Sequence, residues 1–214
     1  MAHPFLLLAD DHVIIRRGLR VLIDSRFSRS TMQECDSVKE VMNVLAKYPF
    51  THLILDMQLA DGNIIEVLPE IKKVYPDIPV LIYTMSSEEI FGQRILQLGA
   101  AGFLSKQSNE QEVIKALDIF LSGKKYISSE LQDILNENQF RKTKAENPIM
   151  NLSDRELSVL NYLLKGYSVK DISSKLDLKA TTVATYKARI FDKLNVTNII
   201  ELRNITDLYQ FKNS

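Results

Sequence analysis

FLLLADD, residues 5–11, is a short apolar run that ends in two carboxylates, and runs of similar length recur along the first half of the chain. Such runs are typical of strands buried on both faces. The predicted strands are FLLLAD at 5–10, a β-rich run at 31–34, HLILD at 52–56, PVLIYT at 79–84 and GFLS at 102–105. Segments of helical period accompany them at 13–23, 38–46, 64–74, 89–98 and 109–121. Because parallel strands need crossover connections, this alternation predicts an α/β domain with a five-stranded, parallel, doubly wound sheet.

Polar side chains stand where four of these predicted strands end. Asp10 and Asp11 close the first strand, Asp56 closes the third, Thr84 closes the fourth, and Lys106 follows the fifth. In open α/β sheets the ligand binds beyond the carboxyl ends of the strands, so we expect these side chains to line one pocket. Three carboxylates in one pocket repel one another unless a cation neutralises them. Oxygen ligands suit a hard cation, and the pattern therefore predicts a Mg²⁺ site.

A nucleophilic carboxylate beside a magnesium site and an ammonium is suited to phosphoryl transfer. We expect Asp56 to accept the phosphoryl group. Asp56 and the two carboxylates of the first strand would hold Mg²⁺, and the backbone carbonyl of Gln58 would complete its shell. Thr84 would donate a hydrogen bond to one phosphoryl oxygen, and the Lys106 ammonium would pair with another.

The composition changes after residue 122. Residues 123–148 lose the apolar period and gather Asn, Glu, Lys and Ser, so we interpret them as a linker, part of which can continue as a polar helix. After Pro148 the pattern is wholly helical, with four segments and short connections. The predicted domains are thus 3–122 and an all-α domain at 149–214. Acidic side chains outnumber basic ones in the first, and the reverse holds in the second, which favours a cation site beside a nucleic-acid binder.

The helices of the second half each have an apolar and a polar face. Capping-box patterns at Ser153 and Ser168 mark where two of them begin. A turn at 177–179 leads to a helix that begins near Thr181. Its inward stripe is Val183, Tyr186 in part, Ile190 and Leu194. Its outward residues are small or basic and fit a DNA major groove; they are Thr181, Ala184, Thr185, Lys187, Ala188 and Arg189.

Residues 3–122 resemble the receiver domain of two-component response regulators. The matching segments are DD at 10–11, LILDMQL at 53–59, IYT at 82–84 and GFLSK at 102–106. The resemblance implies a flavodoxin-like fold, phosphorylation of Asp56 by a sensor histidine kinase, and Phe103 as the aromatic switch residue that rotates with Thr84. Ala60 and Met85 stand where the family commonly has proline and a small residue. The bulk of Met85 predicts a narrower site or a slower loss of the phosphoryl group.

Residues 149–209 resemble the LuxR-type helix-turn-helix domain of the NarL/LuxR class. The matching segments are LSDREL at 152–157, KGYSVKDIS at 165–173, TTV at 181–183 and KLNV at 193–196. The resemblance implies that a helix-turn-helix at 168–187 binds promoter DNA. Contacts with bases fall on Ala184, Thr185 and Ala188. Contacts with phosphates fall on Lys170, Thr182, Lys187, Arg189 and Lys193.

The last predicted helix, from Asn198 to about Tyr209, carries more apolar residues than one small core needs. They are Ile199, Ile200, Leu202, Ile205 and Leu208. Two uses are open: a two-fold interface that sets the spacing of DNA half-sites, or a fuller contact with the core of the domain.

These features predict a DNA-binding response regulator of a two-component phosphorelay, not an enzyme. Mg²⁺-dependent phosphorylation of Asp56 would control homodimerisation and binding to double-stranded promoter DNA, and thereby transcription. One alternative is a constitutive DNA-binding regulator whose receiver serves only as a protein-interaction module, which Met85 favours. Another is a phosphotransferase or phosphatase, which is disfavoured because Met57 and Gln58 offer no general acid.

We expect a cytoplasmic protein without a membrane segment, because the chain has no signal-peptide pattern and its apolar runs are short. The single cysteine, Cys35, cannot form an internal disulfide. We interpret it as a small buried hydrophobe without a function.

Overall fold

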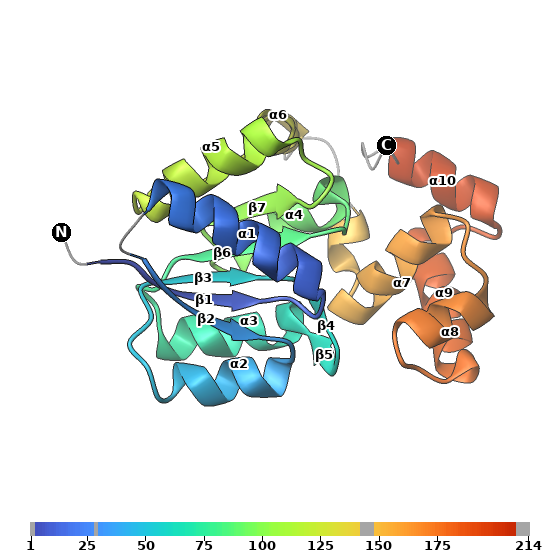
Figure 1. Cartoon of the computed structure of the whole chain (residues 1–214). Coiled ribbons are helices and arrows are strands. Elements are labelled where there is room, and N and C mark those ends of the chain that lie inside the picture. Colours follow the sequence, from blue (N-terminus) through green and yellow to red (C-terminus); the bar gives the residue numbers. More distant parts are fainter. Residues whose placement is uncertain (1–2, 28–29, 142–147, 209–214) are drawn as a thin grey trace. The chain divides into compact units, whose positions relative to one another are not determined.

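The computed structural model describes residues 3–27, 30–141 and 148–208 of the chain (Figure 1). These residues form two compact units. One contains the residues up to 88 together with 95–129, and the other contains 89–94 together with the described residues from 130 onward. The first unit therefore extends past residue 122, where the sequence pattern places the end of the first domain.

The first unit is built on a five-stranded parallel sheet, which confirms the predicted fold class. The strand order is β2-β1-β3-β6-β7. The strands are β1 (Phe5–Ala9), β2 (Thr31–Cys35), β3 (His52–Leu55), β6 (Val80–Thr84) and β7 (Gly102–Ser105). The helices are α1 (Val13–Arg26), α2 (Val38–Leu45), α3 (Ile64–Val74), α4 (Glu88–Gln97) and α5 (Glu110–Leu121). Every predicted strand and helix of this half of the chain is therefore present.

The central strands are apolar on both faces because helices cover both faces of the sheet. Leu6 and Leu8 of β1 belong to the same buried cluster as Leu19 of α1 and Phe120 of α5. Leu7, which points the other way, is also fully buried. Figure 1 shows α1 and α5 on one side of the sheet and α2 and α3 on the other. Since this interior excludes unpaired charge, the charged groups of these strands lie at their carboxyl ends.

The start of the predicted linker is part of the first unit. Tyr126 is 2% exposed, its backbone N–H donates to the Ala101 carbonyl at 2.9 Å, and its hydroxyl donates to Glu112 at 2.6 Å. It pairs with Gly102, where an added Cβ would lie 2.7 Å from the Tyr126 carbonyl oxygen. Helix α6 (Ser129–Arg141) follows, so part of the linker does continue as a polar helix. Residues 142–147 of the predicted linker lie outside the described residues.

A short antiparallel hairpin follows β3 and was not predicted from the sequence. It consists of β4 (Gln58–Leu59) and β5 (Gly62–Asn63). The Ile64 N–H donates to the Met57 carbonyl at 2.8 Å, which closes the hairpin at its base. Asn63 then caps α3 by accepting a hydrogen bond from the Ile65 N–H at 2.9 Å. The hairpin thus connects the end of β3 directly to the start of α3.

The second unit is helical, as the sequence predicts. From residue 148 on, its elements are a 3₁₀ turn (Pro148–Asn151), α7 (Asp154–Leu164), α8 (Val169–Lys175), α9 (Ala180–Leu194) and α10 (Ile199–Leu208). Ser153 and Ser168 form the predicted capping boxes with Glu156 and Asp171. Of the predicted inward stripe of α9, Val183, Ile190 and Leu194 are buried and Tyr186 is half-buried. The buried apolar residues before α9 include Leu157, Leu160, Leu163, Leu164, Ile172 and Leu176.

Helix α10 divides its apolar residues between core and surface. Leu202 is fully buried and Ile205 is half-buried, whereas Ile199 and Ile200 are 37% and 68% exposed. The side chain of Leu208 and all of Tyr209 lie outside the described part of the chain. Among the described residues, no helix combines the length and the apolar character that crossing a membrane requires.

Candidate functional site

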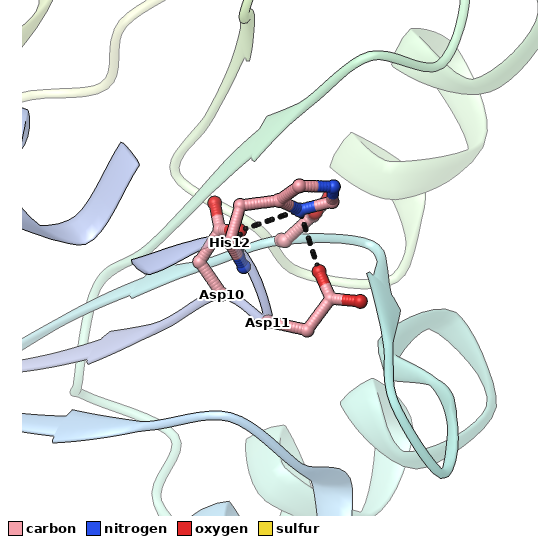
Figure 2. A group of neighbouring side chains, drawn as sticks. Asp10, Asp11 and His12 are labelled. Carbon is pink, nitrogen blue, oxygen red and sulfur yellow. Dashed lines mark hydrogen bonds and ion pairs between the residues drawn. The ribbon is translucent and has the colours of Figure 1, made fainter. Parts of the chain in front are cut away.

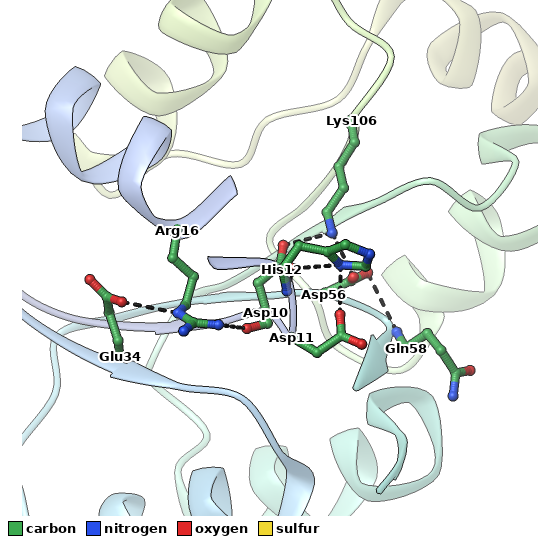
Figure 3. Close-up of polar contacts among 8 residues, drawn as sticks. All are labelled: Asp10, Asp11, His12, Arg16, Glu34, Asp56, Gln58 and Lys106. Atoms are coloured by element: carbon green, nitrogen blue, oxygen red, sulfur yellow. Dashed lines mark hydrogen bonds and ion pairs between the residues drawn. The ribbon is translucent and has the colours of Figure 1, made fainter. Parts of the chain in front are cut away.

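The strand order brings the predicted acidic residues together at the carboxyl edge of the sheet. Asp10 follows β1 and Asp56 follows β3, the neighbouring strand. The Lys106 ammonium, beyond β7, lies 2.6 Å from Asp10 Oδ2 and 2.6 Å from Asp56 Oδ2 (Figure 3). The side chains of Lys106, Asp10 and Asp56 are only 3%, 2% and 6% exposed. The site is therefore a buried cluster in which one ammonium pairs with two carboxylates and leaves a net negative charge.

The balance of burial and charge shifts the pKa values of this cluster. Burial raises the pKa of Asp56 above its ordinary value, against the opposing effects of the Lys106 ammonium and a hydrogen bond from Thr84. Burial alone would lower the pKa of Lys106, but Asp56 and Asp10 together raise it. The lysine thus stays charged beside a carboxylate that is costly to ionise.

His12 joins the acidic group, a contact that sequence patterning does not reveal (Figure 2). Its Nδ1 lies 2.7 Å from Asp11 Oδ1 and 3.1 Å from Asp10 Oδ1, although the ring is 66% exposed. The donor atoms of Asp10, Asp11, His12 and Asp56 all lie within 4.8 Å of one another. Three carboxylates in so small a volume are compatible with a hard divalent cation such as Mg²⁺.

The remaining predicted receiver residues lie around Asp56. Thr84, at the end of β6, is 2% exposed and accepts a hydrogen bond from the Ser86 N–H at 3.3 Å. The Gln58 N–H approaches Asp56 Oδ1 at 3.4 Å. Phe103 is fully buried, and Met85 is 52% exposed, so much of Met85 lies on the surface.

Arg16, one helical turn into α1, and Glu34, in β2, support the site, and sequence reasoning missed both. The Arg16 guanidinium donates to the backbone carbonyl of Asp10 and to Glu34 Oε2, the latter at 3.0 Å (Figure 3). Burial acts to raise the pKa of Glu34, but Arg20 and Arg16 hold it below its ordinary value. These contacts fix the backbone at the end of β1, immediately before Asp11.

The predicted DNA-contacting residues lie on the outer face of α9 and the neighbouring helix α8. Thr181, Ala184, Thr185, Ala188 and Arg189 are exposed, Thr182 and Lys187 are half-buried, and Lys170 is exposed on α8. The face therefore combines small side chains with cations, as the sequence predicts.

Lys193 differs from the other predicted phosphate-contacting residues. Its ammonium lies 2.7 Å from the buried carboxylate of Glu156 and 3.2 Å from the Asn151 carbonyl. Although burial opposes it, Lys193 and Ser153 hold the pKa of Glu156 below its ordinary value. Lys193 is thus already engaged in joining α9 to the start of α7.

Two family models match the chain. The response regulator receiver domain matches residues 6–118, and the luxR family of bacterial regulatory proteins matches residues 150–206. The response regulator UvrY of Escherichia coli (strain K12) is 30% identical over 199 residues, covering 93% of this chain and 91% of UvrY. The response regulator GacA of Pseudomonas aeruginosa is 28% identical over 196 residues, covering 92% of each chain.

Solved structures of the response regulator RcsB resemble the chain over nearly its whole length. RcsB from Salmonella typhimurium matches with a TM-score of 0.67 and 25% identity, covering 98% of this chain and 99% of RcsB. A structure of two RcsB dimers bound to two parallel DNAs matches with a TM-score of 0.59 and 25% identity, covering 96% and 98%. The chain therefore belongs to the NarL/LuxR-class response regulators, DNA-binding regulators of transcription that join an N-terminal receiver domain to a C-terminal LuxR-type domain.

Proposed function

We propose that Asp56 accepts a phosphoryl group from a sensor histidine kinase and that this phosphorylation controls binding to promoter DNA. The observation that carries the proposal is the buried cluster at the carboxyl edge of the sheet. There the Asp56 carboxylate lies 2.6 Å from the Lys106 ammonium and close to Asp10 and Asp11. It combines a nucleophile with the charges that phosphoryl transfer requires.

The residues present fit a magnesium ion. Asp10, Asp11 and Asp56 supply oxygen donors, and the backbone carbonyl of Gln58, two residues beyond Asp56, is a further candidate ligand. Bound there, Mg²⁺ would neutralise negative charge on the phosphoryl oxygens during transfer.

Each side chain of the cluster then has a defined part in the transfer. An Asp56 oxygen attacks the phosphorus of the kinase phosphohistidine, forming an O–P bond as the P–N bond breaks and the imidazole leaves. The Lys106 ammonium pairs with a phosphoryl oxygen, and the Thr84 hydroxyl donates to another. The phosphoryl group adds about −1.5 to −2 charges, which draws Thr84 inward and alters the packing of Phe103.

In this proposal the helical unit binds the promoter DNA. We assign base contacts to Ala184, Thr185 and Ala188 of α9, and phosphate contacts to the cations and hydroxyls around them, which are Lys170, Thr181, Thr182, Lys187 and Arg189. Lys193 reaches a phosphate only if it releases Glu156. The RcsB dimers on DNA support a homodimer, and the exposed Ile199 and Ile200 of α10 suit its two-fold interface. A regulator that binds bacterial promoters acts in the cytoplasm.

The test uses the full-length protein and its Asp56→Asn variant, each incubated with Mg²⁺ and acetyl phosphate. Intact mass should show one added phosphoryl group on the wild type and none on the variant. A gain on both proteins would place the modification elsewhere, and no gain on either, with a cognate kinase also tried, would refute phosphorylation at Asp56.

A further inference from the structure

The hairpin that follows Asp56 has few interactions within itself that hold its conformation. Its strands β4 and β5 pair over only two residues each. None of its residues has a positive φ, so the two-residue turn at Ala60 and Asp61 is not of the primed types whose twist matches that of paired strands. Ala60 occupies the first position of the turn, where proline is favoured because its ring fixes φ. Alanine does not restrict φ in this way.

Beyond the Ile64–Met57 bond that closes its base at 2.8 Å, the hydrogen bonds made by Gln58 and Ala60 are long. The Gln58 side-chain amide donates to the Gly62 carbonyl at 3.4 Å, and the Ala60 N–H donates to the Asp36 carbonyl at 3.4 Å. The Gln58 N–H approaches Asp56 Oδ1 at the same distance. Hydrogen bonds of this length hold a backbone position only loosely.

Asp61 supplies short contacts to a different element. Its carboxylate accepts hydrogen bonds from the backbone N–H groups of Val38 at 2.5 Å and Lys39 at 3.0 Å, at the start of α2. These donors have no acceptor within their own helix, and the helix dipole favours a carboxylate there. The helix's own cap, Ser37, accepts only from the Glu40 N–H, at 3.4 Å. Asp61 therefore fastens the tip of the hairpin to α2.

We propose that Asp61 is a positioning residue for the phosphorylation of Asp56. By holding the tip of the hairpin, it keeps the Gln58 backbone beside Asp56, where the Gln58 N–H meets a carboxylate oxygen and its carbonyl is the candidate ligand for Mg²⁺. The inference rests on the proposed function of Asp56 and adds a determinant of the Mg²⁺ requirement. Asp61 itself touches neither the phosphoryl group nor the cation.

The experiment measures the rate of phosphorylation by acetyl phosphate, followed by intact mass, as a function of Mg²⁺ concentration. In Asp61→Ala the rate at low Mg²⁺ should fall about tenfold, since small misplacements of reacting groups have effects of this size or larger. The Mg²⁺ concentration for half-maximal rate should rise, and saturating Mg²⁺ should recover much of the rate. The amide oxygen of Asp61→Asn can still accept these hydrogen bonds, so its rate at low Mg²⁺ should lie between those of the wild type and Asp61→Ala.

A further variant separates positioning from a general effect on α2. Ser37→Ala removes the other cap of the same helix without touching the hairpin, and should be phosphorylated like the wild type. Far-UV circular dichroism of each full-length variant checks that it is folded.

Each outcome decides the inference. A wild-type rate and Mg²⁺ dependence in Asp61→Ala, or an equal loss in Ser37→Ala, would overturn it. A wild-type protein that takes no phosphoryl group would instead overturn the proposed function, and the inference with it.

Discussion

Replacing Lys106 with methionine should destabilise the metal-free receiver at neutral pH. The ammonium lies 2.6 Å from both Asp10 and Asp56, and all three side chains are almost fully buried. Methionine keeps much of the aliphatic stem but leaves two carboxylates facing each other without a cation. Removing one partner of a buried ion pair costs about 3–5 kcal/mol, because the remaining charge is uncompensated.

Urea unfolding of the full-length protein in the presence of a chelator measures this loss. With a typical slope of about 1–3 kcal/mol per molar urea, the midpoint of the receiver transition should fall by about 1–5 M. Added Mg²⁺ should restore part of the stability, because it binds the same carboxylates in the folded state. Lys115→Met is the control, since the Lys115 side chain is 60% exposed in its pair with Glu112 and its loss should cost less than about 1 kcal/mol. An equally small loss for Lys106→Met would refute the reasoning.

Four other predictions follow from the same geometry. Asp56→Asn should stabilise the metal-free protein at neutral pH, because burial raises the pKa of Asp56 and makes its ionised form costly; in urea titrations the gain should shrink as the pH falls through that pKa. Burial raises the pKa of Cys35 to about 12, so a thiol reagent at neutral pH should modify it only after unfolding. Glu156→Gln should destabilise the helical unit by about 1–3 kcal/mol in urea, because it weakens the capping box and the pair with Lys193. Arg189→Ala should weaken binding to all DNA sequences alike and reduce the salt dependence by about one counterion.

For each of these four predictions, one experimental result would contradict the physical reason given. An Asp56→Asn gain that stays constant with pH would show that ionisation of Asp56 is not its source. Rapid modification of Cys35 in the native state would mean that the end of β2 opens readily. Unchanged unfolding of Glu156→Gln would leave Lys193 free for DNA, and an unchanged salt dependence in Arg189→Ala would remove that residue from the phosphate contacts.

The sheet and its pocket are predictable because one physical constraint produces both. Strands buried on two faces must be continuously apolar, so their charged residues concentrate at the ends, and the order of parallel strands then gathers Asp10, Asp56 and Lys106. The helical unit is predictable for a similar reason, since its caps and apolar stripes are local in sequence.

What the sequence pattern missed depends on contacts that form only in the folded chain. No periodic signal marks the contact of His12 with the Asp10 and Asp11 carboxylates, or that of Arg16 with the Asp10 carbonyl and Glu34. Tyr126 lies in a polar stretch, and its place beside β7 depends on space above Gly102, a property of the folded backbone. From the sequence, Lys193 is expected to be a solvated cation on an outer face. In the folded unit, Glu156 of α7 lies beside it and pairs with it.

We propose that phosphorylation of Asp56 controls DNA binding. The most direct measurement is the affinity of one preparation, before and after treatment with acetyl phosphate and Mg²⁺, for double-stranded fragments that the protein itself enriches from a random pool at fixed salt. If phosphorylation of Asp56 controls binding, the wild type should bind more tightly after treatment and Asp56→Asn should not change. Equal affinity of the phosphorylated and unphosphorylated wild type would contradict it and favour a constitutive DNA-binding regulator whose receiver serves only for protein interaction.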